Sequence, residues 1–294
     1  MTDPHPEAAD PARIISFQGT FGAYSDLACR RVFPDMTTLP CNQFEDAFAA
    51  VREGRAQLAM IPIENSVAGR VADIHHLMPD SSLHIIGEHF ERVNHHLLGL
   101  PGTTLAQIRS VKSHVQALSQ CRNLIRSLGI EPIVTADTAG AATEIAARGD
   151  PSVAAIASEL AGKIYGLISL KENIEDAEHN TTRFLIMSRE ALRPQRGTPA
   201  VTTFLFRVRN VPAALYKALG GFATNGVNMT KLESYMVGGA FTATQFYADV
   251  EAHPEDRPLA LALEELAFFS RELKILGVYP AHPSRIAAAA AGIK

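Results

Sequence analysis

Apolar residues recur along the chain in short runs that alternate with longer stretches of helical spacing. Between residues 13 and 189 the short runs predict buried strands. These strands cover Ile14 to Phe17, Gln57 to Ile63, Leu83 to Phe90, Val93 to Gly99, Ile108 to Val111, Glu131 to Thr135, Val153 to Ile156 and Phe184 to Met187. The longer stretches predict helices from Ser25 towards Arg31, over Phe44 to Arg52, from Ser113 to Gly129, from Asp137 to Gly149 and over Ala157 to Ala161. Strands that alternate with helices are typical of an α/β domain.

A second pattern follows a polar segment with two prolines, residues 190–200, which we interpret as a linker. The expected elements are a strand (Thr202 to Val208), a helix (Pro212 to Ala223), two strands (Met229 to Val237 and Phe241 to Val250), a helix (Pro258 to Phe269) and a strand (Glu272 to Tyr279). This βαββαβ order is ferredoxin-like. Pro212 suits the first helical position, and Gly238-Gly239 suits a hairpin turn. We therefore predict domains at 13–189 and 201–280, a disordered tail at 1–12 and a frayed helix or tail at 281–294.

Charge and composition point to a small-molecule ligand. The net charge is -4 and the pI is near 6.3, without runs of Lys or Arg, so neither nucleic acid nor an anionic membrane is an expected partner. No apolar run approaches the roughly 20 residues of a membrane span, and the acidic, proline-rich start lacks the apolar region of a signal peptide. The odd set Cys29, Cys41 and Cys121 fits reduced thiols in the cytoplasm.

Polar and small residues gather where strands give way to helices. Such junctions contain Gly19 and Gly22, the run Glu64-Asn65-Ser66, the run from Ser113 to Gln116, and Thr138. Helix N-termini around one cleft suit a small anion, especially one with carboxylates. Asn65, Ser66 and Ser113 also suit helix caps, and we prefer His114 and Gln116 as groups that orient a ligand. Because a third glycine and a Gly-Lys-Ser/Thr sequence are missing, nucleotide binding is disfavoured.

Histidines and acidic residues alternate along the two strands near residue 90. Glu88, His89, Glu91, His95 and His96 match no common metal-binding spacing, so hydrogen-bonded or solvated side chains are favoured over metal ligands. The segment Asn180 to Phe184 differs, because it places polar side chains at the entrance of a buried strand, where chemistry is often located.

Five segments in this order resemble the prephenate dehydratase family. They are Gly19 to Ser25, Pro62 to Ser66, Ser113 to Leu118, Thr138 to Ala142 and Asn180 to Phe184. The resemblance implies an α/β fold of two lobes, similar to a periplasmic binding protein, followed by a ferredoxin-like ACT domain. It implies conversion of prephenate to phenylpyruvate in phenylalanine biosynthesis without a metal or other cofactor. It also implies a homodimer or homotetramer with phenylalanine as an allosteric effector.

The resemblance assigns roles to residues of this chain. The catalytic group is Thr182, Arg183 and Phe184. The substrate-binding group is Gly22, Ala23, Tyr24, Glu64, Asn65, Ser66, Ser113, His114, Gln116, Thr138, Ala139 and Asn180. The effector group is Pro212, Ala213, Ala214, Leu215, Asn228, Glu233 and Ser234. We expect Thr182 to donate a hydrogen bond or proton to the departing hydroxyl, and Arg183 to pair with a carboxylate or a local acid.

Several positions depart from the family pattern, including Met236, which stands where the family has proline. Val115 stands where the family has proline, which frees the backbone without removing a functional group. Ala213 replaces the glycine of a Gly-Ala-Leu segment, and its methyl group is expected to crowd the backbone of a bound effector. Tyr235 replaces an arginine and removes a cation that is expected to bridge subunits. The changes at 213 and 235 bear on the effector site.

Two other functions fit the sequence. An arogenate dehydratase differs only near the side chain of the substrate, and a non-catalytic anion sensor would share the cleft and the ACT module. The segment Thr182-Arg183-Phe184 argues against the sensor. A fusion to chorismate mutase is disfavoured, because about twelve residues before the first strand leave no room for that helical domain.

Overall fold

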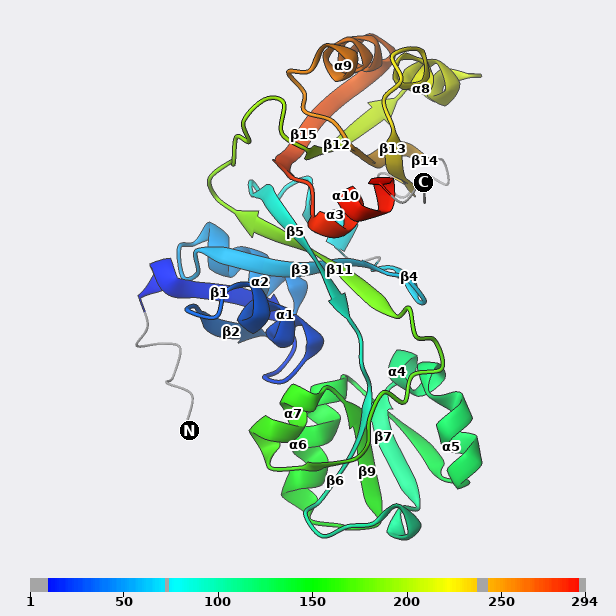
Figure 1. The fold of residues 1–294 in the computed structure, drawn as a ribbon. Coiled ribbons are helices and arrows are strands. Elements are labelled where there is room, and N and C mark those ends of the chain that lie inside the picture. Colours follow the sequence, from blue (N-terminus) through cyan, green and yellow to red (C-terminus); the bar gives the residue numbers. More distant parts are fainter. Residues whose placement is uncertain (1–9, 72–73, 237–242, 291–294) are drawn as a thin grey trace. The chain divides into compact units, whose positions relative to one another are not determined.

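A computed structural model of the protein describes residues 10–71, 74–236 and 243–290 (Figure 1). The contacts within the chain divide it into two compact units. The first unit combines Met1–His75 with His89–Leu185, and the second combines His76–Glu88 with Ile186–Lys294. No helix of the described residues is both long and apolar enough to cross a membrane.

The first unit contains two sheets. The strands of the first are β1 (Ile14–Gln18), β2 (Thr37–Cys41), β3 (Leu58–Asn65), the two-residue β4 (Gly69–Arg70) and β11 (Thr181–Ser188), in the order β11-β3-β1-β2 with β4 beside β3. β1 runs parallel to both β2 and β3. The helices α1 (Tyr24–Val32) and α2 (Phe44–Arg52) follow β1 and β2. β1 is almost fully buried because its apolar residues face helices on one side and the rest of the core on the other.

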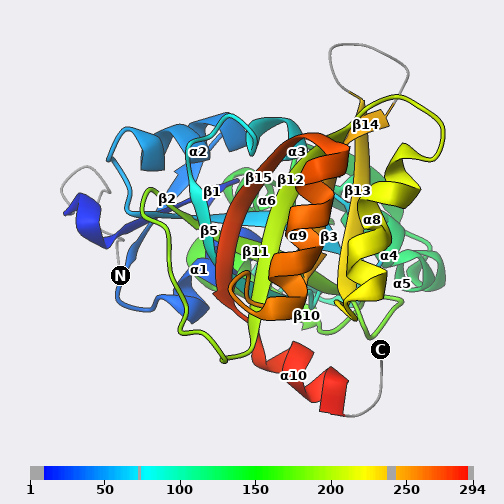
Figure 2. The same ribbon diagram turned by 90° about the horizontal axis from the view of Figure 1, so that it is seen from above.

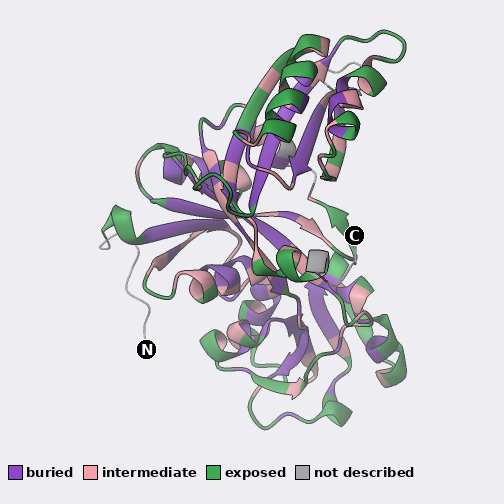
Figure 3. Ribbon diagram, turned by 45° about the horizontal axis from the view of Figure 1, so that its top comes forward, coloured by how far each residue is buried: buried purple, intermediate pink, exposed green. Residues whose placement is uncertain are grey.

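The second sheet of this unit has the order β10-β6-β9-β7-β8. Its strands are β6 (His96–Gly99), β7 (Ser110–His114), β8 (Glu131–Thr135), β9 (Val153–Ala157) and β10 (Ile168–Lys171). Its helices are α4 (Val115–Gln120), α5 (Arg122–Leu128), α6 (Thr138–Arg148) and α7 (Glu159–Tyr165). One apolar cluster packs α4 and α5 against the sheet, and a second, rich in alanine, packs α6 and α7. The inner strands β6, β7 and β9 are therefore mostly buried between helices (Figure 3).

The second unit contains the predicted βαββαβ order. Its elements are β12 (Ala200–Val208), α8 (Ala214–Thr224), β13 (Met229–Met236), β14 (Ala243–Val250), α9 (Arg257–Phe269) and β15 (Ser270–Pro280). The antiparallel sheet has the order β13-β14-β12-β15. α8 and α9 lie side by side over one face of it (Figure 2). Their apolar sides cover Phe204, Phe206 and Phe246, which fixes the core of this unit.

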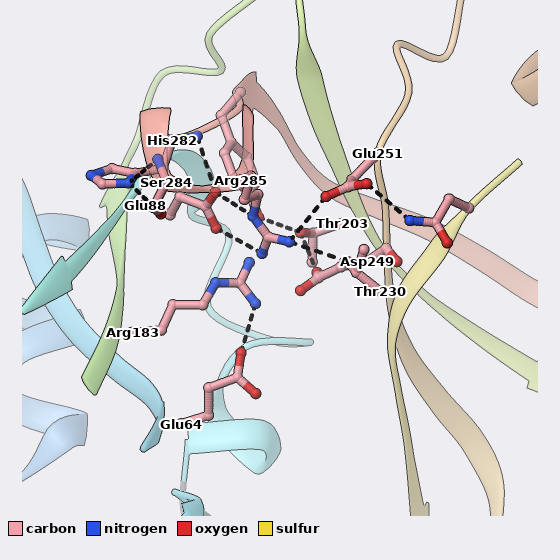
Figure 4. Close-up of polar contacts among 12 residues, drawn as sticks. Glu64, Glu88, Arg183, Thr203, Thr230, Asp249, Glu251, His282, Ser284 and Arg285 are labelled. Carbon is pink, nitrogen blue, oxygen red and sulfur yellow. Dashed lines mark hydrogen bonds and ion pairs between the residues drawn. The ribbon is translucent and has the colours of Figure 1, made fainter. Parts of the chain in front are cut away.

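Two segments complete the second unit. The start of β5 (His84–Arg92) runs parallel to β15, with Ile85 opposite Gly277. α10 (Pro283–Ala290) begins where a frayed helix or tail was expected. Its Arg285 donates to both carboxylate oxygens of the buried Glu88 at 2.6 and 3.0 Å (Figure 4). Because two parallel N–H···O bonds fix a guanidinium against a carboxylate, α10 is held on β5.

Several predicted elements differ from the structure. The strands β2 and β10 were missed, because β2 contains Pro40 and β10 is an exposed edge strand. The helix predicted from Ser113 to Gly129 is two helices separated at Cys121. Pro212 is not the first helical residue, since Ala213 takes φ 60 and α8 begins after it. Gly238-Gly239 lies outside the described residues.

The three cysteines are buried and free, as expected for reduced thiols. Burial raises the pKa of the Cys41 thiol to about 11, because the thiolate charge is unfavourable away from water. It raises the pKa of Cys29 and Cys121 as well. The thiols therefore contribute to packing as small apolar groups.

Replacing Gly277 by alanine is expected to destabilise the pairing of β15 with β5. A Cβ atom at this position would lie 2.1 Å from the carbonyl oxygen of Ile85, so the backbones must move apart. The expected loss in the free energy of unfolding is about 2 to 3 kcal/mol, measured by urea denaturation. Gly220→Ala is the matched control, because its Cβ would meet nothing within 4 Å in α8. The control is expected to gain up to about 1 kcal/mol, and equal losses in both variants would contradict the prediction.

Candidate active site

A cavity of about 530 Å³ in the first unit is lined by residues from both of its sheets. Its lining includes Gln18, Tyr24, Asn65, Arg70, His95, His114, Gln116, Gln120, Thr138, Thr182 and Phe184. Amides, hydroxyls, imidazoles and one guanidinium thus converge on a space large enough for a small molecule. This composition suits an anion that carries several oxygen atoms.

The side chain of Asn65 is fixed by the turn that follows β3. Its Oδ1 accepts hydrogen bonds from the backbone N–H groups of Val67 and Ala68 at 3.0 and 2.8 Å. Because a backbone N–H is always a donor, the two bonds set which end of the carboxamide is oxygen. Asn65 Nδ2 therefore donates, and it reaches Thr182 Oγ1 at 3.0 Å and Asn180 Oδ1 at 2.8 Å.

Thr182 is the second residue of β11, and its side chain is half-buried at the cavity. Its Oγ1 accepts from Asn65, so one acceptor position is occupied and its own O–H proton points elsewhere. A hydroxyl with this arrangement is a hydrogen-bond donor to whatever the cavity holds. The donor role expected of Thr182 stays a prediction, and its contact with Asn65 is compatible with that role.

Arg183 and Glu64 form an ion pair on the neighbouring strands β11 and β3 (Figure 4). Arg183 Nη1 lies 2.9 Å from Glu64 Oε1, with the arginine side chain 3% exposed and the glutamate side chain 33% exposed. Successive residues of a strand point to opposite faces, so Arg183 lies on the other face of β11 from Thr182. Of the two expected partners, a substrate carboxylate or a local acid, the arginine pairs with a local acid.

Seven of the predicted site residues line the cavity together. They are Tyr24, Asn65, His114, Gln116, Thr138, Thr182 and Phe184. Gly22 and Ala23 do not present their amides to a ligand, because the Gly22 N–H donates to Asp26 Oδ2 and the Ala23 N–H to the carbonyl of Thr20. Gly22 instead lets the loop pack closely, since a Cβ there would lie 2.7 Å from the Cα of Ala161.

Four further predicted residues support the site from behind. Ser113 is buried on β7 and donates to the carbonyl of Ile156 at 2.6 Å, so it is not the expected N-cap. β7 extends one residue beyond Ser113, to His114. His114 therefore caps α4, and its Nδ1 accepts a hydrogen bond from the Gln116 N–H. Ser66 donates to the carbonyl of His179 and accepts from the Thr181 N–H, and no helix follows it directly. Ala139 is fully buried in the alanine-rich core, and Asn180 is 1% exposed.

The predicted effector residues are spread along the second unit. Pro212 to Leu215 lie at the start of α8, and Asn228 follows its end. Eleven helical residues separate these two positions by about 16 Å, at 1.5 Å per residue. Asn228 Nδ2 donates to Glu251, whereas Glu233 and Ser234 are on β13. One small ligand cannot span both ends of α8.

Gln120, His95 and Arg70 are among the cavity residues that the sequence analysis did not assign to the site. Gln120 follows Gln116 by one helical turn, a spacing that places both on one helix face and was available in the sequence. His95 belongs to the histidines that were expected to be hydrogen-bonded, and this expectation is confirmed by its contacts with Tyr24 and Gln120. Arg70 brings a guanidinium from β4, and no sequence pattern indicated it.

Known proteins are similar to this chain over most of its length. A family model described as prephenate dehydratase matches residues 15–192. A protein of Komagataeibacter europaeus named "Bifunctional N-acyl-homoserine lactone acylase/prephenate dehydratase" is 58% identical over 93% of this chain and 98% of its own length. A chloroplastic arogenate dehydratase/prephenate dehydratase 1 of Arabidopsis thaliana is 42% identical over 90% of this chain and 71% of its own.

Solved structures agree with these similarities. A crystal structure of prephenate dehydratase from Arthrobacter aurescens in complex with L-Phe superposes with a TM-score of 0.83 at 30% identity, covering 95% of this chain and 98% of that one. A structure described as a novel type of quorum-quenching acylase superposes with a TM-score of 0.88 at 58% identity, covering 93% and 100%. The predicted α/β class is confirmed by the two sheets of the first unit and by these matches. The chain therefore belongs to the prephenate dehydratase family, and its members are hydro-lyases.

Proposed function

We propose that this protein converts prephenate to phenylpyruvate in phenylalanine biosynthesis. The observation that carries the proposal is the hydrogen bond from Asn65 to Thr182, which leaves the Thr182 proton available to the cavity. The proposed catalytic domain is 13–189, and residues 190–200 link it to a proposed ACT domain at 201–280. A disordered tail was expected up to residue 12, but the described residues Pro11–Arg13 form a 3-10 helix capped by Asp10. The three buried, free cysteines support a location in the cytoplasm.

The reaction needs one well-placed proton donor. Prephenate loses its ring carboxylate as carbon dioxide, and the electron pair of the broken bond enters the ring. The ring hydroxyl leaves at the opposite carbon, and one proton is added to it to give water, so the dianion becomes the monoanion phenylpyruvate. Thr182 donates a hydrogen bond to the departing oxygen, where negative charge develops. Aromatisation of the ring drives both departures.

The remaining polar residues of the cavity hold the dianion. His114 lies at the end of β7, Gln116 and Thr138 lie in the first turns of α4 and α6, and Arg70 supplies positive charge from β4. Phe184 supplies an aromatic surface beside Thr182. Arg183 and Glu64 do not line the cavity. Their ion pair fixes β11 against β3 next to Thr182. Holding the ring between these groups orients both leaving groups for reaction.

Turnover assays test the proposal. The purified protein is incubated separately with prephenate and with arogenate, and formation of phenylpyruvate and phenylalanine is followed. Phenylpyruvate from prephenate is the expected result. Phenylalanine from arogenate, without turnover of prephenate, would identify an arogenate dehydratase. Saturable binding of either anion without turnover would identify a sensor.

The second unit is proposed to bind phenylalanine and to join copies of the chain. The predicted effector residues lie at both ends of α8, so a site that uses all of them requires parts from two subunits in a homodimer or homotetramer. Exposed side chains such as Tyr216 (81%) and Phe268 (78%) give this unit apolar surface for such contacts. Calorimetric titration with phenylalanine and sedimentation of the free protein test both parts. Absence of heat would contradict phenylalanine binding, and a monomer in solution would contradict the proposed homodimer or homotetramer.

Replacing Ala213 by glycine is expected to stabilise the second unit. Ala213 has φ 60, the left-handed conformation, which an L-residue with a Cβ adopts at a cost of about 1 kcal/mol. The expected gain in the free energy of unfolding is therefore about 1 kcal/mol, measured by urea denaturation. The neighbouring Ala214→Gly lies in the first turn of α8 and is expected to lose stability instead. Destabilisation by Ala213→Gly would contradict the prediction.

A second candidate activity is hydrolysis of N-acyl-homoserine lactones. The observation that favours it is the 58% identity to the Komagataeibacter europaeus protein over nearly all of both chains. Release of homoserine lactone from an acylated substrate by the purified protein would establish this activity. If Thr182→Ala lost prephenate turnover and kept acylase turnover, the two activities would use different groups.

A further inference from the structure

A chain of hydrogen bonds extends from Asn65 away from Thr182. Asn65 Nδ2 donates to Asn180 Oδ1, so the Asn180 carboxamide presents its nitrogen on the other side. Asn180 Nδ2 donates to Gln120 Oε1 at 3.0 Å. Asn180 is 1% exposed, so each end of its amide is used inside the protein. The turn after β3 therefore fixes, through Asn65 and Asn180, which end of the Gln120 carboxamide is the oxygen.

The orientation of Gln120 determines the protonation of His95. His95 Nε2 lies 2.8 Å from Gln120 Oε1, and an oxygen with this orientation only accepts. Nε2 therefore carries a proton, since two lone pairs at this distance would repel each other. Burial lowers the pKa of His95, because the imidazolium charge is unfavourable away from water, while the bond to Gln120 and the charge of Glu175 act in the opposite direction. The ring is thus neutral with its proton on Nε2, and Nδ1 is an acceptor.

Neighbouring groups hold the His95 ring in place. The Tyr24 hydroxyl lies 2.8 Å from Nδ1 and 2.7 Å from the carbonyl oxygen of Asn94. Burial raises the pKa of Tyr24, so the phenol keeps its proton and shares it between these two acceptors. The rings of Tyr24 and His95 meet edge to face, with centroids 5.5 Å apart. The His95 backbone N–H donates to Glu175 Oε2, and its carbonyl accepts from the Ile174 N–H. His95 is 2% exposed and has no room to rotate its ring freely.

We propose that His95 is a positioning residue that aims the carboxamide nitrogen of Gln120 into the cavity. Gln120 Oε1 accepts two hydrogen bonds, from His95 and Asn180, which fixes the amide plane. In the part of the chain that the structure describes, none of the hydrogen bonds uses Gln120 Nε2, and Gln120 lines the cavity. Its two N–H groups are presented to a carboxylate of the bound anion. This inference rests on the proposed function, because it identifies a group that orients the substrate of that site.

Two substitutions at His95 separate positioning from general packing. The amide nitrogen of glutamine can take the position of His95 Nε2, which bonds to Gln120. The shorter asparagine places its amide nitrogen at the position of Nδ1 and cannot reach Gln120. We expect His95→Asn to lower kcat/KM for prephenate by about 10-fold, the scale of one neutral hydrogen bond, and His95→Gln to stay within about threefold of the wild type. His96→Asn is the matched control, because His96 is the next residue of the chain, at the start of β6, and its Nδ1 lies 2.9 Å from Ser169 Oγ. The control is expected to keep wild-type turnover.

A double-mutant cycle tests whether His95 acts through Gln120. If it does, His95→Asn has little further effect in a Gln120→Ala protein, because the group that it positions is gone. The proposal would be overturned if the losses of the two single variants multiplied in the double variant, if His95→Asn kept full activity, or if His95→Asn and His95→Gln lost activity equally. The proposed function would still stand. Nitrogen NMR of the wild type is expected to place the proton on Nε2, and a proton on Nδ1 would also overturn it. If the wild-type protein does not turn over prephenate, the proposed function fails and the positioning role falls with it.

Discussion

Replacing Thr182 by alanine is expected to lower kcat for prephenate by at least about 100-fold, the scale of losing one positioned donor to a developing oxyanion. Asn65 occupies an acceptor position of the Thr182 hydroxyl, so its proton is directed to the cavity, where the departing oxygen must be stabilised. The alanine variant loses this donor, while β11 keeps the apolar residues that bury it. Initial rates of phenylpyruvate formation measure the loss, and circular dichroism checks the fold.

Two further variants at this position separate the hydroxyl from the side-chain volume. Thr182→Val keeps the shape without the donor and is expected to behave like the alanine variant. Thr182→Ser keeps the donor and is expected to retain turnover within about 10-fold of the wild type, since a freer rotor loses some orientation. Near-normal turnover in the valine variant would refute the assignment of Thr182.

The elements that were predicted best have strong local signals at their ends. β8 matches its predicted bounds, and α6 begins after the cap Asp137 and ends at Gly149 in the left-handed conformation. β10 was missed because three of its four residues are exposed, so the strand lacks the apolar pattern of a buried one. Because β8 is also an edge strand with several exposed residues, its bounds were predicted from Gly129 before it and Asp137 after it and not from burial.

The candidate site was predicted in its parts and not in its connections. Asn65 and Thr182 belong to segments that were singled out, yet they are 117 residues apart, and their hydrogen bond follows only from the pairing of β3 with β11. The same holds for His95 and Gln120, which are 25 residues apart and meet because the residue before β6 and the last residue of α4 come together in one unit. Asn180 was expected to bind substrate, but its amide is used to connect Asn65 with Gln120. Residue types indicate chemistry, and the fold decides which atoms remain available for it.

Changing Asn65 to aspartate is expected to reverse the donor direction at Thr182 without disturbing the turn. One carboxylate oxygen still accepts from Val67 and Ala68, whose N–H groups hold the residue in place. The other oxygen takes the position of Nδ2, 3.0 Å from Thr182 Oγ1, and accepts where Asn65 donated. The Thr182 proton then turns to the introduced carboxylate and is withdrawn from the substrate. We expect kcat/KM to fall by at least about 100-fold, with a loss in kcat itself.

The exposed Asn42 provides a control with the same change of charge. Asn42→Asp adds one negative charge to the same unit at an exposed side chain that does not line the cavity, although its backbone carbonyl accepts from the lining residue Gln18. This variant is expected to keep wild-type kcat. Comparing the two variants separates lost orientation of Thr182 from weaker attraction of a dianion, because the latter raises KM and leaves kcat unchanged. A change in KM alone for Asn65→Asp would mean that Asn65 attracts the substrate and does not set the direction of the Thr182 hydroxyl. A fall in kcat shows that turnover needs the donor direction that the turn after β3 gives to Asn65 Nδ2, which Thr182 and Asn180 both receive.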